Sequence, residues 1–114
     1  MTPEELRRRT KAFALEIVRT FRVLPKTEDA RIMGKQLLKA GTSVGANYRA
    51  AGRARSKAEF VPKMGVVVEE ADETVFRLEL PDETGLFRKN ELLREANELV
   101  AIFSASYRTA KYGR

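Results

Sequence analysis

The residues best suited to chemistry in this chain are four carboxylates close together, Glu69, Glu70, Asp72 and Glu73. Carboxylates grouped on a helix can bind a hard cation, so a metal site made of carboxylates alone is one interpretation. A di-metal site in a helical bundle also uses Glu-x-x-His pairs, and the chain contains no histidine. Ion pairing with Arg77, at helical spacing from Glu70 and Glu73, explains the cluster better. We therefore predict no metal and no cofactor.

Other catalytic arrangements also lack essential members. The chain has neither cysteine nor histidine, which excludes disulfides, thiolate and imidazole metal ligands, and Ser–His or Cys–His nucleophile pairs. Ser43 and Ser56 therefore have no histidine to activate them. Gly34-Lys35-Gln36 lacks the upstream glycine loop and the Ser or Thr of a phosphate-binding loop. The sequence predicts a protein that is not an enzyme and has no catalytic residues.

The composition is that of one soluble globular domain spanning residues 1–114. Hydrophobic residues make up 43% of the chain and charged residues 33%, which is too apolar for a disordered chain. No apolar run approaches the roughly 18–20 residues that cross a bilayer, and the N-terminal stretch lacks the apolar core of a signal peptide. We expect a cytoplasmic protein without a membrane partner. Its net charge of +6 is compatible with an anionic partner.

Four segments have apolar residues at helical spacing, and they predict helices over about 3–24, 28–53, 57–80 and 90–111. These helices must position the carboxylates and the other polar side chains. Thr2 with Glu5, and Ser56 with Glu59, have the spacing of capping boxes, and Asn90 is a candidate cap for the last helix. Residues 81–85, PDETG, predict a turn. Because no segment alternates with period two, the predicted fold is all-α, an antiparallel up-down-up-down four-helix bundle.

Glycines and surplus apolar residues favour self-association. Gly34, Gly41, Gly45 and Gly52 fall on one face of the second predicted helix, where another backbone can approach closely. A loop over residues 41–47 is the alternative to this helix. The run Val66-Val67-Val68 covers three directions about 100° apart, so one buried stripe cannot hide all three. We therefore expect a homo-oligomer.

The charges separate by bundle end in this topology. One end has only three acids, Glu4, Glu5 and Glu59, against twelve bases, a net charge of +9, and the other end has −3. The twelve bases are Arg7, Arg8, Arg9, Lys11, Arg49, Arg53, Arg55, Lys57, Lys63, Arg108, Lys111 and Arg114.

A cationic end of this kind attracts phosphates. We predict contact with RNA or DNA and weigh it against a merely solvated face and an anionic membrane surface. The residues predicted to bind nucleic acid are Arg7, Arg8, Arg9, Arg49, Arg53, Arg55, Lys57, Arg108 and Lys111. Tyr48 and Tyr107 fit the core stripes better than a base-stacking role. Asn47 has two interpretations, a buried polar residue bonded to a side chain such as Glu70, or a surface residue.

Several segments resemble the four helix bundle protein family, also called the ribosomal-RNA intervening-sequence protein family. The most specific is Ser43–Phe60, which reads SVGANYRAAGRARSKAEF. Residues 69–80, EEADETVFRLEL, resemble the family's third helix. Residues 13–18 with 24–26 resemble its first helix and turn, and residues 95–99 with 105–110 its last helix. The matching motif positions are Ser43, Asn47, Arg53, Ser56, Glu59, Phe60 and Glu70, which we interpret as mainly structural, except Arg53.

The resemblance implies an antiparallel bundle that assembles into a ring, a homopentamer. A similar protein is the accessory subunit of diversity-generating retroelements, which implies nucleic acid and a polymerase, a reverse transcriptase, as partners. No enzymatic activity is implied. We therefore expect a non-enzymatic oligomeric bundle that contacts nucleic acid through its basic end. A protein–protein scaffold that binds no nucleic acid is the alternative.

Overall fold

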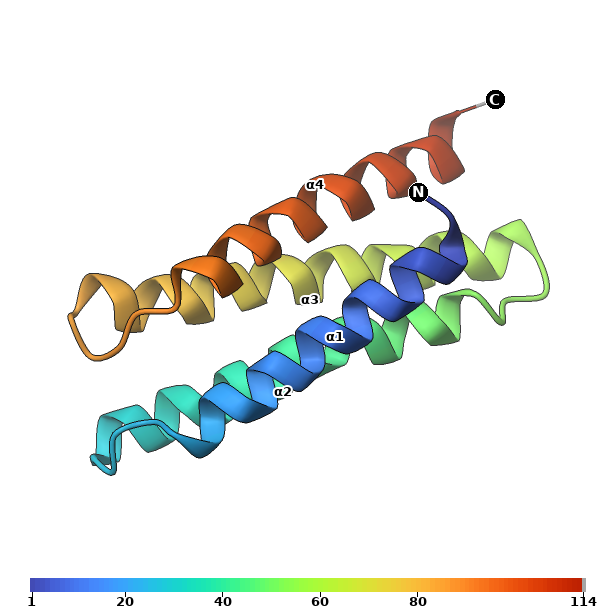
Figure 1. Ribbon diagram of the computed structural model, residues 1–114. Coiled ribbons are helices and arrows are strands. Elements are labelled where there is room, and N and C mark those ends of the chain that lie inside the picture. The colour runs from blue at the N-terminus through green and yellow to red at the C-terminus, as the bar shows by residue number, and fades with distance from the viewer. Residues whose placement is uncertain (114) are drawn as a thin grey trace.

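The computed structural model describes residues 1–113, and Arg114, which was counted with the basic end, lies outside them. It contains four α-helices, α1 (Pro3–Arg22), α2 (Glu28–Ala51), α3 (Lys57–Glu83) and α4 (Asn90–Tyr112). Residues 1–113 contain no β-strand, so the predicted all-α class is confirmed. The α1–α2 and α3–α4 connections lie at one end, and the α2–α3 connection lies with both termini at the other (Figure 1). Successive helices therefore run in opposite directions.

Side-chain caps explain where the first three helices begin. Thr2 and Glu5 form the complete predicted capping box, in which the Glu5 backbone N–H donates to Thr2 Oγ1 at 3.1 Å. Thr27 accepts from the backbone N–H of Ala30. Ser56 accepts from the backbone N–H of Glu59 at 3.1 Å. Each bond satisfies an amide that has no partner within its own helix.

The ends of α1 and α3 differ from the predicted ends. α1 ends at Arg22 rather than at residue 24, because Pro25 disfavours the helical conformation of Leu24. The predicted turn at residues 81–85 is wrong in its first half, since α3 continues through Pro81 to Glu83. Gly85, at φ +75°, supplies the left-handed conformation that ends it.

The start of α4 and the end of α2 also differ from expectation. Asn90 is the first residue of α4 rather than its cap, and the cap position, Lys89, makes no side-chain capping bond. α2 ends at Ala51, two residues before the predicted end. The segment over residues 41–47 is helical, so the loop alternative is wrong.

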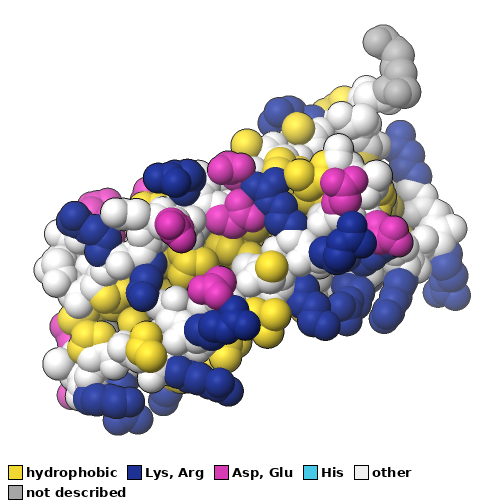
Figure 2. All heavy atoms as spheres, in the orientation of Figure 1, with side chains coloured by type: hydrophobic (Ala, Val, Ile, Leu, Met, Phe, Trp, Pro, Cys, Tyr) yellow, Lys and Arg dark blue, Asp and Glu magenta, His cyan; other side chains and the backbone are white. Residues whose placement is uncertain are grey.

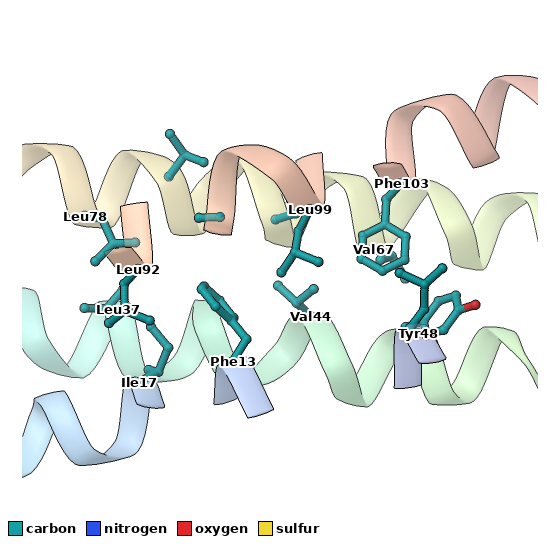
Figure 3. Close-up of a cluster of buried hydrophobic side chains, with 14 of the residues drawn as sticks. Phe13, Ile17, Leu37, Val44, Tyr48, Val67, Leu78, Leu92, Leu99 and Phe103 are labelled. Atoms are coloured by element: carbon teal, nitrogen blue, oxygen red, sulfur yellow. The ribbon is translucent and has the colours of Figure 1, made fainter. Parts of the chain in front are cut away.

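All four helices contribute to one core (Figure 3). Ile17, Leu37, Leu99 and Phe103 are almost completely buried, and the rings of Tyr48 and Phe103 lie 5.0 Å apart. Burial of such a side chain stabilises a fold by roughly 1.5–3 kcal/mol. The core therefore holds each helix in a fixed rotation about its axis, which determines which charged residues face outward.

The helices pack mainly on their neighbours in the chain. α1 packs along α2, α2 along α3, and α3 along α4, whereas α1 and α4 make few contacts with each other. The molecule is elongated, with extents of 48 × 21 × 21 Å. The seam between α1 and α4 is therefore the weakly packed side of the bundle.

The glycine face of α2 is covered by α1. A Cβ on Gly34 would lie 2.5 Å from Leu24, and a Cβ on Gly41 would lie 2.7 Å from Ile17. A Cβ on Gly45 would lie 3.3 Å from the Thr10 carbonyl oxygen. These three glycines allow close approach of α1 within the chain. They therefore do not support self-association, contrary to our expectation.

The valine run behaves as its spacing predicts. Val67 is buried in the core, Val68 is half-buried, and Val66 is exposed to 41%. Other large apolar side chains left exposed include Ile32 on α2 and Phe76 on α3.

Candidate nucleic-acid interface

A cleft between the first turns of α1 and the last turns of α2 gathers basic side chains. Its volume is about 520 Å³. Gly52 forms part of its wall, and the other residues around it are all cations. We call these residues the basic cleft: Arg7, Arg8, Lys11, Arg49 and Arg53. α1 supplies three of the cations, and the last turns of α2 with the residue after its cap supply two.

The cations of the basic cleft have no acidic partner. Within residues 1–113, none of the five side chains takes part in an ion pair. In Figure 2, Lys and Arg side chains follow the lower side of the molecule, which is the α1–α2 side of Figure 1. Among residues 1–113, no ion pair therefore neutralises the positive charge of the basic cleft.

Helix geometry explains why the cations converge. Arg7 and Lys11 are four residues apart on α1 and therefore share a face. A Cβ on Gly52 would lie 3.7 Å from Arg7 Nη1, so the Arg7 guanidinium reaches over the carboxyl end of α2. The carboxyl end of a helix carries partial negative charge, which favours a cation there.

Tyr48, next to Arg49 in the chain, belongs to the core. Its side chain is 7% exposed and packs on Phe103. Burial raises the pKa of the Tyr48 phenol, and the nearby Arg7 charge opposes that rise. The core assignment of Tyr48 is confirmed. Tyr107 is half-buried against the core, whereas Tyr112 is 72% exposed.

Arg9 is placed away from the basic cleft. Its guanidinium donates to Glu95 on α4 from Nε and Nη2, and Nη2 also donates to Glu98. Sequence reasoning grouped Arg9 with Arg7 and Arg8 because they are adjacent. One residue of helix turns a side chain by about 100°, and this rotation directs Arg9 toward α4.

The other predicted binding residues lie outside the cleft. Arg55 and Lys57 flank the start of α3, and Arg55 Nε is 4.0 Å from a Glu59 carboxylate oxygen. Arg108 and Lys111 are on the last turns of α4, where the Lys111 amine donates to the Tyr107 hydroxyl at 3.3 Å. The structure thus brings together four of the nine predicted residues and adds Lys11, which was counted in the basic end but not among them.

The predicted motif positions have mainly local contacts. Ser43 donates to the Lys39 carbonyl oxygen at 2.6 Å, and Ser56 caps α3. Phe60 is half-buried against the core. The predicted capping box is incomplete, because within residues 1–113 the Glu59 carboxylate accepts no hydrogen bond from the Ser56 backbone N–H. It lies 4.0 Å from Arg55 Nε instead.

Asn47 and Glu70 are both half-buried, but the structure records no hydrogen bond between them within residues 1–113. Burial raises the pKa of the Glu70 carboxyl, and the charge of Glu73 adds to the effect while Lys39 opposes it. Glu73 lies 3.8 Å from Arg77, as the helical spacing predicts. No group of three or more acidic side chains in the described part of the chain is arranged to hold a metal ion.

The family model described as 23S rRNA-intervening sequence protein matches residues 4–105. This match includes all of α1 but its first residue, α2 and α3, all five cations of the basic cleft and most of α4. The chain belongs to the 23S rRNA-intervening sequence protein family. The predicted resemblance is therefore confirmed.

A solved structure similar to this family member is a protein of unknown function from the S23 ribosomal protein family of Bacteroides thetaiotaomicron VPI-5482. The two are 29% identical, with a TM-score of 0.85 over 96% of this chain and 100% of the other. No curated protein matches the chain. Among residues 1–113, none of the helices is both long and apolar enough to cross a membrane.

Proposed function

We propose that this family member is a non-enzymatic cytoplasmic protein that binds nucleic acid through the basic cleft. The observation that carries the proposal is the convergence of five cations from α1 and α2 without a single acidic partner among the described residues. Arginine guanidinium groups offer paired donors that match phosphate oxygens. The five cations of the basic cleft therefore suit the phosphate groups of a nucleic-acid backbone.

The energetics of the cleft support this proposal. Like charges four residues apart on a helix, such as Arg7 and Lys11, destabilise it by roughly 0.2–0.5 kcal/mol. Gathering further cations across two helices adds repulsion that no ion pair within residues 1–113 offsets. A bound polyanion removes this repulsion and releases its counterions, which favours binding at low salt. The family name refers to an intervening sequence of 23S rRNA, so a structured RNA is the first ligand to test.

We also propose that the chain self-associates, with the homopentamer implied by the resemblance as the expected state. Val66 and Phe76 on α3 support this, because they leave large apolar side chains in water. The molar mass in solution, measured by light scattering after size exclusion, tests this. A monomer at micromolar concentration contradicts it.

The same apolar side chains favour a second candidate function, a scaffold that binds a protein such as a polymerase and no nucleic acid. A salt series of binding to structured RNA and to duplex DNA distinguishes the two. We compare the wild type with Lys11→Glu/Arg49→Glu and with a control, Lys89→Glu/Arg94→Glu. The control makes the same change in net charge at two exposed residues near the start of α4, neither of which takes part in an ion pair within residues 1–113.

If the basic cleft binds phosphate, the wild type binds with a steep salt dependence, and the cleft variant loses affinity. Each lost phosphate contact lowers the slope of log K against log salt by about 0.9 for a duplex, so the slope falls by about 2. The control retains most of its affinity. Absence of binding by folded wild-type protein at low salt contradicts the proposal and favours the scaffold.

A further inference from the structure

A second group of cations surrounds the connection between α1 and α2, at the end of the bundle that the sequence assigned a net negative charge. We call it the turn patch, and it consists of Arg22, Lys26, Arg31 and Lys35. They line two depressions that share Lys26 and Arg31. Glu28 is the one acid in these linings. None of the four cations takes part in an ion pair within residues 1–113.

Helix geometry puts the turn patch and the basic cleft on the same face. Arg31 and Arg49 are 18 residues apart on α2, which is five full turns and about 27 Å at roughly 1.5 Å per residue. Lys11 and Arg22 are 11 residues apart on α1, about 17 Å, with a rotation of only about 20°. Because α1 packs along α2, all four residues lie on one side of the α1–α2 pair.

No acidic side chain lines the groove that leads from the basic cleft toward the turn patch. A groove runs from the basic cleft past Ala14, Thr42, Gly45 and Ala46. Glu16, the acid of α1 between the groups, lines a depression on the α4 side and pairs with Arg19. A polyanion lying along this face therefore meets cations at both ends and no carboxylate between them.

The charge of the whole chain divides in the same way. Residues 1–56 contain thirteen bases and five acids, a net charge of +8, whereas residues 57–114 contain nine bases and eleven acids, a net charge of −2. In Figure 2 the basic side chains extend along the α1–α2 side from one end of the molecule to the other. The electrostatic field therefore favours a long anion on this side only.

We propose that the basic cleft and the turn patch together bind one nucleic-acid duplex lying along the α1–α2 face, a proposal that rests on the proposed function. A spacing of about 17–27 Å corresponds to roughly 5–8 base-pair steps of B-form DNA at about 3.4 Å each, and to slightly more steps of an A-form RNA stem, whose rise per step is smaller. A duplex is stiff over this length and meets two fixed patches without being ordered first. The groove between the patches has no aromatic side chain on which an unpaired base could stack.

The test measures binding of the full chain to RNA hairpins that share one loop and have stems of about 4 and about 12 base pairs. The turn-patch variant is Lys26→Glu/Arg31→Glu, and Lys89→Glu/Arg94→Glu is the control with the same change in net charge. On the long stem, we expect the turn-patch variant to lose at least tenfold in affinity and about 2 in salt slope. On the short stem, which cannot reach both patches, we expect a change no larger than that of the control. Circular dichroism checks that each variant is folded.

Several outcomes overturn the proposal. If the turn-patch variant equals the control on the long stem while Lys11→Glu/Arg49→Glu still loses affinity, the basic cleft binds alone. If a single strand of the same length binds as tightly as the long stem and loses as much in the turn-patch variant, the ligand is not a duplex. If the wild type binds neither stem, this proposal and the proposed function fail together.

Discussion

Arg9 and Glu95 join the two helices that are farthest apart in the chain. Arg9 donates from Nε to Glu95 Oε2 and from Nη2 to Glu95 Oε1, both at 2.6 Å. A further bond from Nη2 reaches Glu98 Oε1 at 2.8 Å. The bonds to Glu95, with Glu98 adding to them, raise the pKa of Arg9 above its ordinary value. This group crosses the seam where α1 and α4 otherwise have few contacts.

Removing the Arg9 side chain is expected to destabilise the fold. The Arg9 and Glu95 side chains are only 24% and 27% exposed, so their paired hydrogen bonds are worth more than a surface ion pair. Arg9→Ala should lower the free energy of unfolding by about 1–2 kcal/mol, measured by urea denaturation. Arg19→Ala is the control, because Arg19 pairs with Glu16 on the exposed surface. This substitution should lower the free energy of unfolding by less than about 0.5 kcal/mol. Equal effects of the two substitutions contradict the prediction.

Arg9 and Lys11 should differ in nucleic-acid binding although they are two residues apart. Lys11 belongs to the basic cleft, whereas Arg9 is engaged by Glu95 and Glu98. Lys11→Gln should weaken binding to a structured RNA several-fold and reduce the salt slope by about 1. Arg9→Gln should leave the slope unchanged. A larger loss for Arg9→Gln than for Lys11→Gln refutes this assignment.

Gly41→Ala should destabilise the protein, although alanine favours helices. The new methyl group would lie 2.7 Å from Ile17 Cγ1, and Ile17 is fully buried. Overpacking of this kind costs about 1–3 kcal/mol, against a helix-propensity gain of about 1 kcal/mol.

Gly52→Ala is the matched control for Gly41→Ala. The nearest atom to a Cβ on Gly52 is the Arg49 carbonyl oxygen at 3.5 Å, an ordinary contact. This substitution should be neutral or stabilising by up to about 1 kcal/mol. Thermal unfolding followed by circular dichroism measures the stability of both variants. A stabilising effect of Gly41→Ala would contradict the prediction and show that α1 can move away from α2.

Glu70→Gln should stabilise the protein at neutral pH and not at acidic pH. Burial raises the pKa of Glu70 in the folded state, so the folded state binds more protons than the unfolded state between the two pKa values. Stability is therefore lost as the pH rises through this interval, and glutamine removes the loss. Unfolding temperatures at pH 7 and pH 3.5 test this, with Glu69→Gln on the exposed side of α3 as control. An equal effect of Glu70→Gln at both pH values contradicts it.

Most of the fold could be predicted because its determinants are local in sequence. The apolar spacing of α1 and the Thr2–Glu5 capping box depend on residues a few positions apart, and both are present. Pro81 was misassigned because proline usually breaks a helix interior, although its fixed φ of about −65° is itself a helical value. Composition alone does not distinguish that position from a turn.

The candidate site was predictable only in part, because side-chain partners come from distant segments. Arg9 and Glu95 are 86 residues apart, and which helix faces Arg9 depends on the packing of the whole bundle. The turn patch was missed for a related reason. Counting charge by bundle end combined Arg22 and Arg31 with acids that belong to α3 and α4, on the other side of the molecule.

The sparse seam between α1 and α4 has a consequence for folding speed. Apart from this seam, each helix packs on the helix next to it in the chain, across connections of only five or six residues. The mean sequence separation of contacting residues, the contact order, is therefore low. Chains of low contact order fold in microseconds to milliseconds, because few long loops must close before contacts form. Each helical hairpin can form as soon as its own residues are available, whereas the Arg9–Glu95 contact must close a loop of 86 residues.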